Sequence, residues 1–291
     1  MNLRIVTLNF WGTEAPLERR LELAARQLRA IDPDVVCMQE VKPLGDATTA
    51  HALASRLGMT ACYARASAVL VGPSDATADE EGLAILAKAP LVERRSIALP
   101  EARPDDTRIL LSARVATAGG PIWVHTTHLH YRLDDGVARE HQVVAIDAAI
   151  RACGRDNTDP PQILCGDFNA TPDSDEMRFL RGLTTLRSSP EPIADKRTHF
   201  QDAWLRLHRE PFPGEGPAHG ITWSSENRLT RPLRSLDLDR RIDYVLVTTR
   251  KKDGRGTVHA CNVVLTERDG DDDICASDHY GVFAEVQVVA G

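Results

Sequence analysis

The sequence predicts an α/β fold in which two β-sheets pack together and helices lie outside them. Two observations predict it: strands and helices alternate early in the chain, and many short apolar runs with strand-like character follow. The 291 residues, 42% hydrophobic and 26% charged, are typical of a globular protein. No low-complexity linker or internal repeat divides the chain, so a single domain over residues 1–291 is predicted.

The first elements alternate. A strand is predicted over Leu3–Asn9, and the helix after it shows apolar residues at helical spacing, namely Leu17, Leu21, Ala24, Ala25 and Leu28. Asp32-Pro33 ends this helix because the residue before a proline disfavours helical backbone. Val35–Glu40 then forms a buried strand, and a second helix covers about Ala47–Leu57.

The middle of the chain is rich in predicted strands, over Ala61–Val71, Gly82–Ala87, Leu91–Leu99, Ile109–Val115 and Ile122–Thr127. A helix is predicted at roughly Asp134–Ala152, then an apolar run at Ile163–Cys165. Another helix follows Pro172, where Asp173 and Glu176 have the spacing of a capping box. The last strands are predicted over Ile242–Val247, Val258–Leu265 and Tyr280–Val289.

Composition limits the classes of function. No run approaches the ~18 apolar residues that span a bilayer, and Met1 leads directly into a strand rather than a signal peptide, so a cytoplasmic protein is expected. The net charge of −7 argues against a protein that mainly coats nucleic acid, although it does not exclude a nuclease. The cysteines form no CxxC pair, which favours buried free thiols over a zinc site.

Polar residues stand at the ends of the apolar strand-like runs. They are Asn9, Glu40, His128, Asp167 with Asn169, and Asp278 with His279. Together they supply carboxylates for a hard cation, amides that orient oxygen atoms, and imidazoles for proton transfer. This set suits phosphoester hydrolysis.

Several of these residues also have a purely structural interpretation. Asp167 and Asn169 either share a cleft or cap the entry to a helix. Glu40 is either a metal ligand or a surface residue beyond the sheet. His128 is either a site residue or a hydrogen-bonded core histidine. His125 and His128 point to opposite faces of a strand, so a metal site of three histidines is not expected.

Asp243 is more informative because strand alternation places it on the buried face of Val245. A buried carboxylate needs a partner. That partner is either Arg240 or Arg241, or else His279, whose tautomer Asp243 would then fix.

Three other side chains near these motifs are candidates for contact with the substrate. Trp223 either stacks on a base or an aromatic leaving group, or packs beneath its loop. Arg132 and Arg139 either bind additional phosphates or lie on solvated faces of the loop and the following helix.

Six short motifs, in this order, resemble those of the endonuclease/exonuclease/phosphatase (DNase I-like) superfamily. They are Thr7-Leu8-Asn9, Gln39-Glu40-Val41, Thr127-His128-Leu129, Gly166-Asp167-Phe168-Asn169, Arg241-Ile242-Asp243-Tyr244 and Ser277-Asp278-His279. The resemblance implies a four-layer α/β-sandwich of two mixed β-sheets flanked by helices. It also implies a phosphohydrolase that depends on Mg²⁺ or Mn²⁺.

The resemblance implies metal and water roles at one end of the site. Glu40 would be the principal metal ligand, helped by Asn9 and Asp278. Asp167 would position or deprotonate the attacking water, and Asn169 would hold a phosphate oxygen. Where some members carry a further acidic ligand this chain has Trp11, which favours a single metal.

The imidazoles receive the remaining roles. His279, paired with Asp243, would act as a general base or stabilise the charge on a phosphorane-like state. His128 would contact the phosphate or assist the leaving oxygen, at a position where abasic-site endonucleases of the family have tyrosine. The substrate stays open between nucleic acid and a small-molecule or lipid phosphoester, with a catalytically silent binding module as a third hypothesis. The oligomeric state is not indicated.

Overall fold

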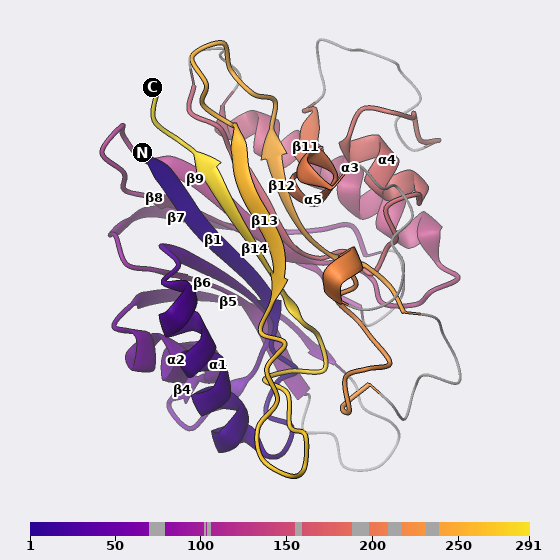
Figure 1. Cartoon of the computed structure of the whole chain (residues 1–291). Coiled ribbons are helices and arrows are strands. Elements are labelled where there is room, and N and C mark those ends of the chain that lie inside the picture. The colour runs from indigo at the N-terminus through magenta and orange to yellow at the C-terminus, as the bar shows by residue number, and fades with distance from the viewer. Residues whose placement is uncertain are drawn as a thin grey trace.

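Two six-stranded β-sheets pack face to face in the computed structural model of the chain, and helices lie on their outer faces (Figure 1). The structure describes residues 1–69, 79–101, 103, 106–154, 159–187, 198–208, 217–230 and 239–291. The strand order is β13-β14-β1-β2-β6-β5 in the first sheet and β11-β12-β10-β9-β8-β7 in the second. Both sheets mix parallel and antiparallel pairs, which confirms the predicted α/β-sandwich.

The first sheet comprises β1 (Asn2–Asn9), β2 (Val35–Val41), β5 (Thr60–Val69), β6 (Asp79–Ala87), β13 (Val258–Val264) and β14 (Gly281–Gln287). The second comprises β7 (Leu91–Ala98), β8 (Ile109–Val115), β9 (Ile122–His128), β10 (Ile163–Asp167), β11 (Phe200–Asp202) and β12 (Asp243–Thr248). A two-stranded ribbon is formed by β3 (Pro43–Leu44) and β4 (Ala47–Thr48). The helices are α1 (Leu17–Ile31), α2 (Thr49–Leu57), α3 (Gly136–Cys153), α4 (Asp175–Leu180), α5 (Ala203–Leu207) and the 3₁₀ turn η2 (Pro217–His219).

Strand alternation produces the layers. In β1, Leu3 and Ile5 face the second sheet, whereas Val6 and Leu8 pack against α1 and α2. In β10, Leu164 faces α3 and α4 on the opposite outer surface. Helices α1 and α2 therefore cover one outer sheet face and α3 and α4 the other, whereas α5 packs against β12 and β13 and contributes Ala203 and Trp204 to the core between the sheets (Figure 1). None of them has the length and apolar character required to cross a membrane.

The predicted start of α4 is wrong. The helix begins at Asp175, with Ser174 in the N-cap position, so Asp173 and Glu176 do not form a capping box. Glu176 instead accepts a hydrogen bond from Arg139 of α3 at 2.6 Å. The Glu176 carboxylate, which the local sequence pattern assigned to capping, therefore belongs to a buried ion pair between two helices.

Other element limits differ less. The second helix begins two residues later than expected because Thr48 belongs to the β3–β4 ribbon and accepts from the backbone N–H of His51. β11 and α5 were not predicted from the sequence. Val71, the predicted end of a strand, lies outside the described residues.

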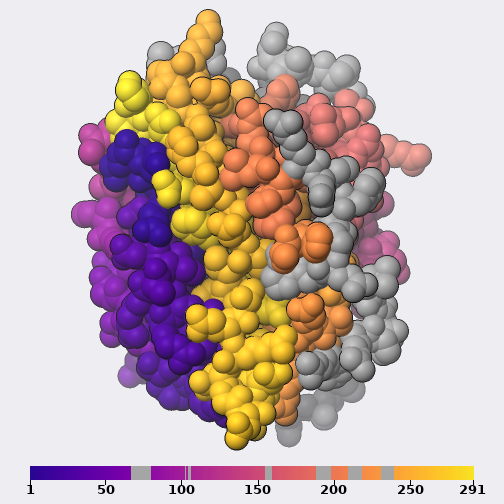
Figure 2. All heavy atoms as spheres, viewed as in Figure 1, coloured from indigo at the N-terminus to yellow at the C-terminus, as the bar shows by residue number. Residues whose placement is uncertain are grey.

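The two ends of the chain are adjacent. Val288, just after β14, donates a backbone hydrogen bond to the carbonyl of Met1 at 3.1 Å. Figure 2 shows the C-terminal strands, in gold and yellow, as a stripe that runs between the indigo N-terminal elements and the orange segments around α5. The last strands thus join the early and late parts of the chain.

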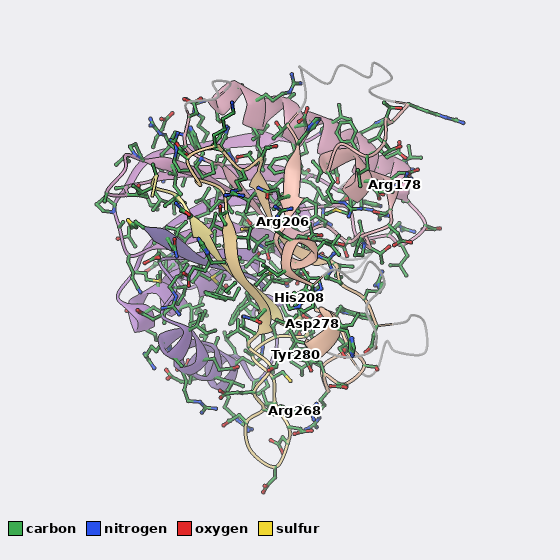
Figure 3. All side chains as sticks on the ribbon, turned by 45° about the horizontal axis from the view of Figure 1, so that its top comes forward. Arg178, Arg206, His208, Arg268, Asp278 and Tyr280 are labelled. Carbon is green, nitrogen blue, oxygen red and sulfur yellow. The ribbon has the colours of Figure 1, made fainter. Side chains whose placement is uncertain are left out.

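A buried ion pair holds α5 against the second sheet. Asp202 accepts two hydrogen bonds from the Arg241 guanidinium, at 2.8 and 3.2 Å, and both side chains are 3% exposed. Asp202 also accepts from the backbone N–H groups of Trp204 and Leu205, so it caps α5. At the other end of α5, His208 (Figure 3) stacks on Trp204 and donates to the carbonyl of Cys261 in β13.

Asp202→Ala should lower the free energy of unfolding by about 3–5 kcal/mol, because it leaves the Arg241 charge buried without its partner. Urea unfolding followed by circular dichroism measures the difference. The matched control is Asp175→Ala, which breaks the exposed pair with Arg178 at the periphery of the molecule (Figure 3) and should cost less than about 1 kcal/mol. Equal losses in the two variants would contradict the importance of the buried pair.

Candidate active site

Six strand ends meet at one end of the sandwich. β1 and β2 are parallel, as are β9 and β10, so their carboxyl ends lie at a common edge. β14 and β12 run antiparallel to them and begin at that edge. Asn9, His128, Asp167 and Asp243 each continue the alternation of the residues that fill the space between the sheets. The site is therefore the polar end of the inter-sheet layer.

A belt of buried polar side chains separates this site from the apolar core. Gln39 donates to the hydroxyl of Thr126 at 2.8 Å and to the hydroxyl of Thr7 at 3.1 Å. All three side chains are fully buried. Because Gln39 and Thr7 belong to the first sheet and Thr126 to the second, the belt also ties the two sheets together directly below the site.

Asp167 lies at the centre of the site. Its Oδ2 accepts from Asn9 Nδ2 at 3.1 Å and lies 3.6 Å from His128 Nε2 and 3.8 Å from His279 Nε2. Its Oδ1 accepts from the backbone N–H of Asn169 at 2.9 Å. Burial, and next the Asp243 carboxylate, raise the pKa of Asp167 to about 6. This carboxylate can therefore exchange a proton near neutral pH.

Gly166 allows β9 and β10 to approach closely enough for this arrangement. Its φ is +151°, and a Cβ at this position would lie 2.1 Å from the carbonyl oxygen of Thr127. Only glycine therefore fits, and the register that results sets Asp167 directly beside His128.

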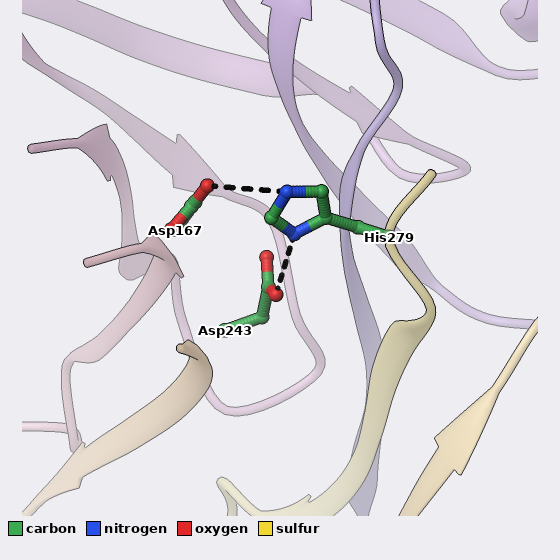
Figure 4. A group of neighbouring side chains, drawn as sticks. All are labelled: Asp167, Asp243 and His279. Carbon is green, nitrogen blue, oxygen red and sulfur yellow. Dashed lines mark hydrogen bonds and ion pairs between the residues drawn. The ribbon is translucent and has the colours of Figure 1, made fainter. Parts of the chain in front are cut away.

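His279 is the partner that the structure gives to Asp243. Its Nδ1 lies 2.9 Å from Asp243 Oδ2, and its Nε2 is directed at Asp167 (Figure 4). Arg241, the alternative partner, is bound to Asp202. Burial by itself lowers the pKa of His279, but the Asp243 carboxylate, followed by those of Asp278 and Asp167, raises it well above its usual value. The carboxylates around His279 therefore favour its imidazolium form.

His128 has the opposite character. Burial, followed by the positive charges of Arg108 and His279, lowers the pKa of His128 well below its usual value. The site therefore pairs a neutral imidazole with a protonated one on either side of Asp167. A neutral imidazole can accept or donate a hydrogen bond, whereas the imidazolium stabilises negative charge.

Glu40 reaches the site through an irregular end of β2. Pairing with β6 shifts between Met38 and Val41, and Glu40 adopts a left-handed backbone with φ of +51°. Its Oε1 accepts from Asn9 Nδ2 at 2.8 Å. Burial, followed by the carboxylates of Glu81 and Asp278, raises the pKa of Glu40 to about 8. A residue in strained backbone at this edge indicates a functional constraint.

Asp278, in the turn before β14 (Figure 3), completes the group of carboxylates near Glu40. Ser277 donates to its Oδ1 at 3.2 Å, and burial raises the pKa of the Asp278 carboxyl. The amide of Asn227 donates to the carbonyls of Ser277 and Asp278 at 2.8 and 3.0 Å, which fixes this turn. The turn therefore presents Asp278 and His279 in a defined orientation.

Two groups of residues could hold a metal. Glu40 accepts from the Asn9 amide, and the carboxylates of Glu81 and Asp278 lie near enough to raise its pKa. Hard divalent cations prefer such oxygen ligands. Asp167, Asp243 and His279 also have one ligand atom each within 4.8 Å of one another. Nδ1 of His279 is engaged by Asp243, and the surrounding carboxylates favour the protonated form of this imidazole over a metal-bound one. The Glu40 group fits a cation better.

A cavity of about 890 Å³ opens over the site. One end is lined by Glu40, His128, Asp167, Asn169 and His279, so the structure brings these sequence-predicted residues together. Asn9 lies buried beneath them.

Trp223 is placed elsewhere. It is 8% exposed and does not line the cavity, its backbone bridges to Arg240 and His279, and the Arg240 guanidinium lies over its ring at 5.1 Å. This is the packing that the alternative interpretation described, and it gives no support to stacking on a substrate.

The sequence interpretation missed Glu81 and Arg108. Glu81 Oε1 lies 4.0 Å from His128 Nδ1 and 3.7 Å from Arg108, and Arg108 donates to Asp106 at 2.6 Å. Both residues line the cavity from the starts of strands that run antiparallel to β2 and β9. Their only signal in the sequence is a charged residue before an apolar run, which is common at any strand start.

Two buried arginines fix the loops around the site. Arg20 of α1 is fully buried, donates to the carbonyls of Phe10, Glu14 and Ala276, and lies over the rings of Phe10 and Trp11 at 4.9 and 5.1 Å. It therefore joins the loop after Asn9 to the turn before Asp278.

Arg139 of α3 is 5% exposed, and its guanidinium holds the loop after His128. It is neither the phosphate ligand nor the solvated residue that the sequence interpretation allowed.

Comparison with known proteins gives a family and a fold. The profile of the Endonuclease/Exonuclease/phosphatase family matches residues 6–279. Truncated TDP2 from Caenorhabditis elegans has a similar structure, with a TM-score of 0.70, 16% identity and coverage of 99% of this chain and 98% of that chain. D. rerio TDP2 complexed with single strand DNA product has a TM-score of 0.71 and 20% identity, with coverage of 99% of each chain. The human nocturnin catalytic domain with bound sulfate anion has a TM-score of 0.68 and 20% identity, with coverage of 99% of this chain and 94% of that chain. No curated protein matched the chain.

The pKa of Glu40 predicts how metal-free stability depends on pH. The folded-state value of about 8 lies above that of an unfolded chain, near 4.3, so the folded protein holds a proton that the unfolded chain releases. This contribution is complete at low pH and is lost as pH rises towards the folded value.

In EDTA, the melting temperature should fall between about pH 5 and about pH 8, and Glu40→Gln should flatten that fall. Differential scanning fluorimetry measures both profiles. Glu18→Gln, whose side chain is 74% exposed, is the control and should keep the wild-type slope. Parallel profiles for the wild type and Glu40→Gln would show that the pKa of Glu40 is not raised in the folded protein.

Proposed function

This chain belongs to the Endonuclease/Exonuclease/phosphatase family, and we propose that it hydrolyses a phosphoester with a divalent cation, as a phosphodiesterase or nuclease. The observation that carries the proposal is the environment of Asp167. The Asp167 carboxylate lies 3.6 Å from His128 and 3.8 Å from His279, and burial raises its pKa to about 6. Its surroundings lower the pKa of His128 and raise that of His279. This combination suits the attack of water on phosphorus, which needs a proton acceptor and a stabiliser of negative charge.

Glu40, Asn9 and Asp278 would hold the cation, Mg²⁺ or Mn²⁺. Their donor atoms are oxygens, and the half-buried carboxylates of Glu40 and Asp278 repel each other unless a positive charge lies between them. When bound, a divalent cation would neutralise charge on the phosphate and on the departing oxygen.

The remaining roles follow from the protonation states. Asp167 would orient the attacking water and take its proton. His279, kept protonated by Asp243, would stabilise the charge that develops on the phosphate oxygens, which makes charge stabilisation a better description than general base catalysis. His128 and Asn169, on the wall of the same cavity, would contact the phosphate.

A phosphatase or phosphodiesterase acting on a small-molecule or lipid phosphoester is the second candidate. The net charge of −7 favours it over a nuclease, because a nucleic-acid backbone is bound most strongly by basic surfaces. The D. rerio TDP2 complex with single strand DNA product supports the nuclease. The silent-module hypothesis is disfavoured because Glu40, Asp167, Asp243, Asp278 and His279 are all present.

The first test is hydrolysis of bis-p-nitrophenyl phosphate, p-nitrophenyl phosphate, a plasmid and a single-stranded RNA, each with Mg²⁺, Mn²⁺ or EDTA. Metal-dependent turnover that disappears in Glu40→Gln is expected, since the substitution removes charge and little volume. Glu18→Gln should retain full activity. Undiminished turnover of Glu40→Gln at low Mg²⁺ would show that Glu40 does not hold the metal.

His279→Ala should reduce turnover by ~10²–10⁴-fold, the effect expected when a proton-transfer or charge-stabilising group is lost. The matched control is His259→Ala, since His259 is exposed on β13. Single-turnover rates on the best substrate provide the measurement. A loss below tenfold would remove His279 from the mechanism.

A further inference from the structure

The loop between β9 and α3 forms one rim of the cavity and exposes apolar side chains. Tyr131 and Leu133 of this loop are 55% and 49% exposed, and Val137, at the start of α3, is 58% exposed. Tyr131 and Arg132 line the same cavity as Asp167. An exposed aromatic side chain on the wall of a site, with further apolar residues next to it in the chain, indicates contact with a ligand.

The loop is held in place rather than free. Arg139 donates to the carbonyls of His130, Arg132 and Leu133, at 3.3, 2.6 and 3.4 Å, and its Nε is bound to Glu176 at 2.6 Å. The Tyr131 ring also packs against that of His130, with centroids 5.4 Å apart. A fixed aromatic surface binds with a smaller loss of conformational entropy than a mobile one.

The charges beneath the rim are already balanced. Arg108 is paired with Asp106, and His130 is bound to Asp106 and lies 3.4 Å from Asp135. Arg103 is paired with Asp135 at 2.5 Å. This part of the cavity therefore offers little net positive charge for an additional phosphate. It fits an uncharged polar group that extends from the phosphate at Asp167.

The rim chemistry favours a flat heteroaromatic ring over an acyl chain. The Arg132 guanidinium lies over the Tyr131 ring, 5.9 Å from its centre, so the two side chains together present a planar, cationic surface on which a flat group can stack. Apolar and charged residues alternate here, as Tyr131, Arg132, Leu133 and Asp134. An acyl chain or a lipid surface would have to cover the Arg132 and Asp134 charges.

We propose that Tyr131 and Arg132 form a stacking subsite for a nucleobase, and that the substrate therefore carries a nucleotide at the phosphate bound beside Asp167. The inference rests on the proposed function for the position of that phosphate. It assigns these two residues to substrate selection and not to the chemical step.

Calorimetric titration with AMP and with ribose 5-phosphate, in the presence of Mg²⁺, tests the subsite. Free phosphate is assayed after each titration, and where either ligand is hydrolysed the ratio of kcat/KM values replaces the ratio of affinities. AMP should bind the wild type about 5- to 150-fold more tightly, the range expected for one stacked base. In Tyr131→Ala the ratio should fall below about threefold, and in Tyr131→Phe it should persist because the ring remains. Leu183→Ala, at an exposed residue 61% accessible and away from the cavity, is the control and should keep the wild-type ratio.

Equal affinities for AMP and ribose 5-phosphate in the wild type, or no AMP binding at millimolar concentration, would overturn the proposal. So would tighter binding of dodecyl phosphate that is lost in Leu133→Ala, which would assign the rim to an apolar chain. An AMP preference in a protein that hydrolyses no phosphoester would retain the subsite and reject the proposed function. Hydrolysis of a phosphoester without an AMP preference would retain the proposed function and reject the subsite.

Discussion

Carboxylates buried at the end of an apolar layer are the constraint on which this site depends. Each one has lost much of its water and needs a compensating group. Asp243 has His279, and Asp167 has the Asn9 amide and the backbone N–H of Asn169. Within the described part of the chain, Glu40 has a single amide hydrogen bond and lies near two other carboxylates. The weakest compensation thus coincides with the place where a cation fits.

The same constraint explains why the surrounding loops are fixed by buried arginines. A site of closely spaced charges works only if its donors and acceptors keep their positions. Arg20 joins the loop after β1 to the turn before β14, and Arg139 holds the loop after β9. Each guanidinium belongs to a helix on an outer face of the sandwich and contacts a loop at the end of the sandwich where the site lies. The helices therefore contribute to the geometry of the site as well as to the core.

Much of this arrangement could be predicted from the sequence, because strand alternation is a local property. It placed Asp243 on a buried face, and the apolar runs located the strands that carry Asn9, His128 and Asp167. Glu81 and Arg108 could not be found in this way. They reach the cavity only because β6 and β8 run antiparallel to β2 and β9, and strand pairing is not encoded in any single segment.

The errors have similar origins. The capping box failed because a distant residue, Arg139, took the carboxylate of Glu176. Trp223 faces Arg240 instead of the cavity, since its bridges to Arg240 and His279 set its orientation.

The belt of Gln39, Thr126 and Thr7 has a consequence for how such a protein can change over time. It is uncharged, fully buried and satisfied by its own hydrogen bonds, so a neutral polar layer lies between the hydrocarbon interior and the charged groups above it. Substitutions that alter the charge or shape of the cavity need not disturb the packing below, and repacking below need not move the reactive groups. Divergence in specificity and drift in the interior can then proceed independently within one scaffold.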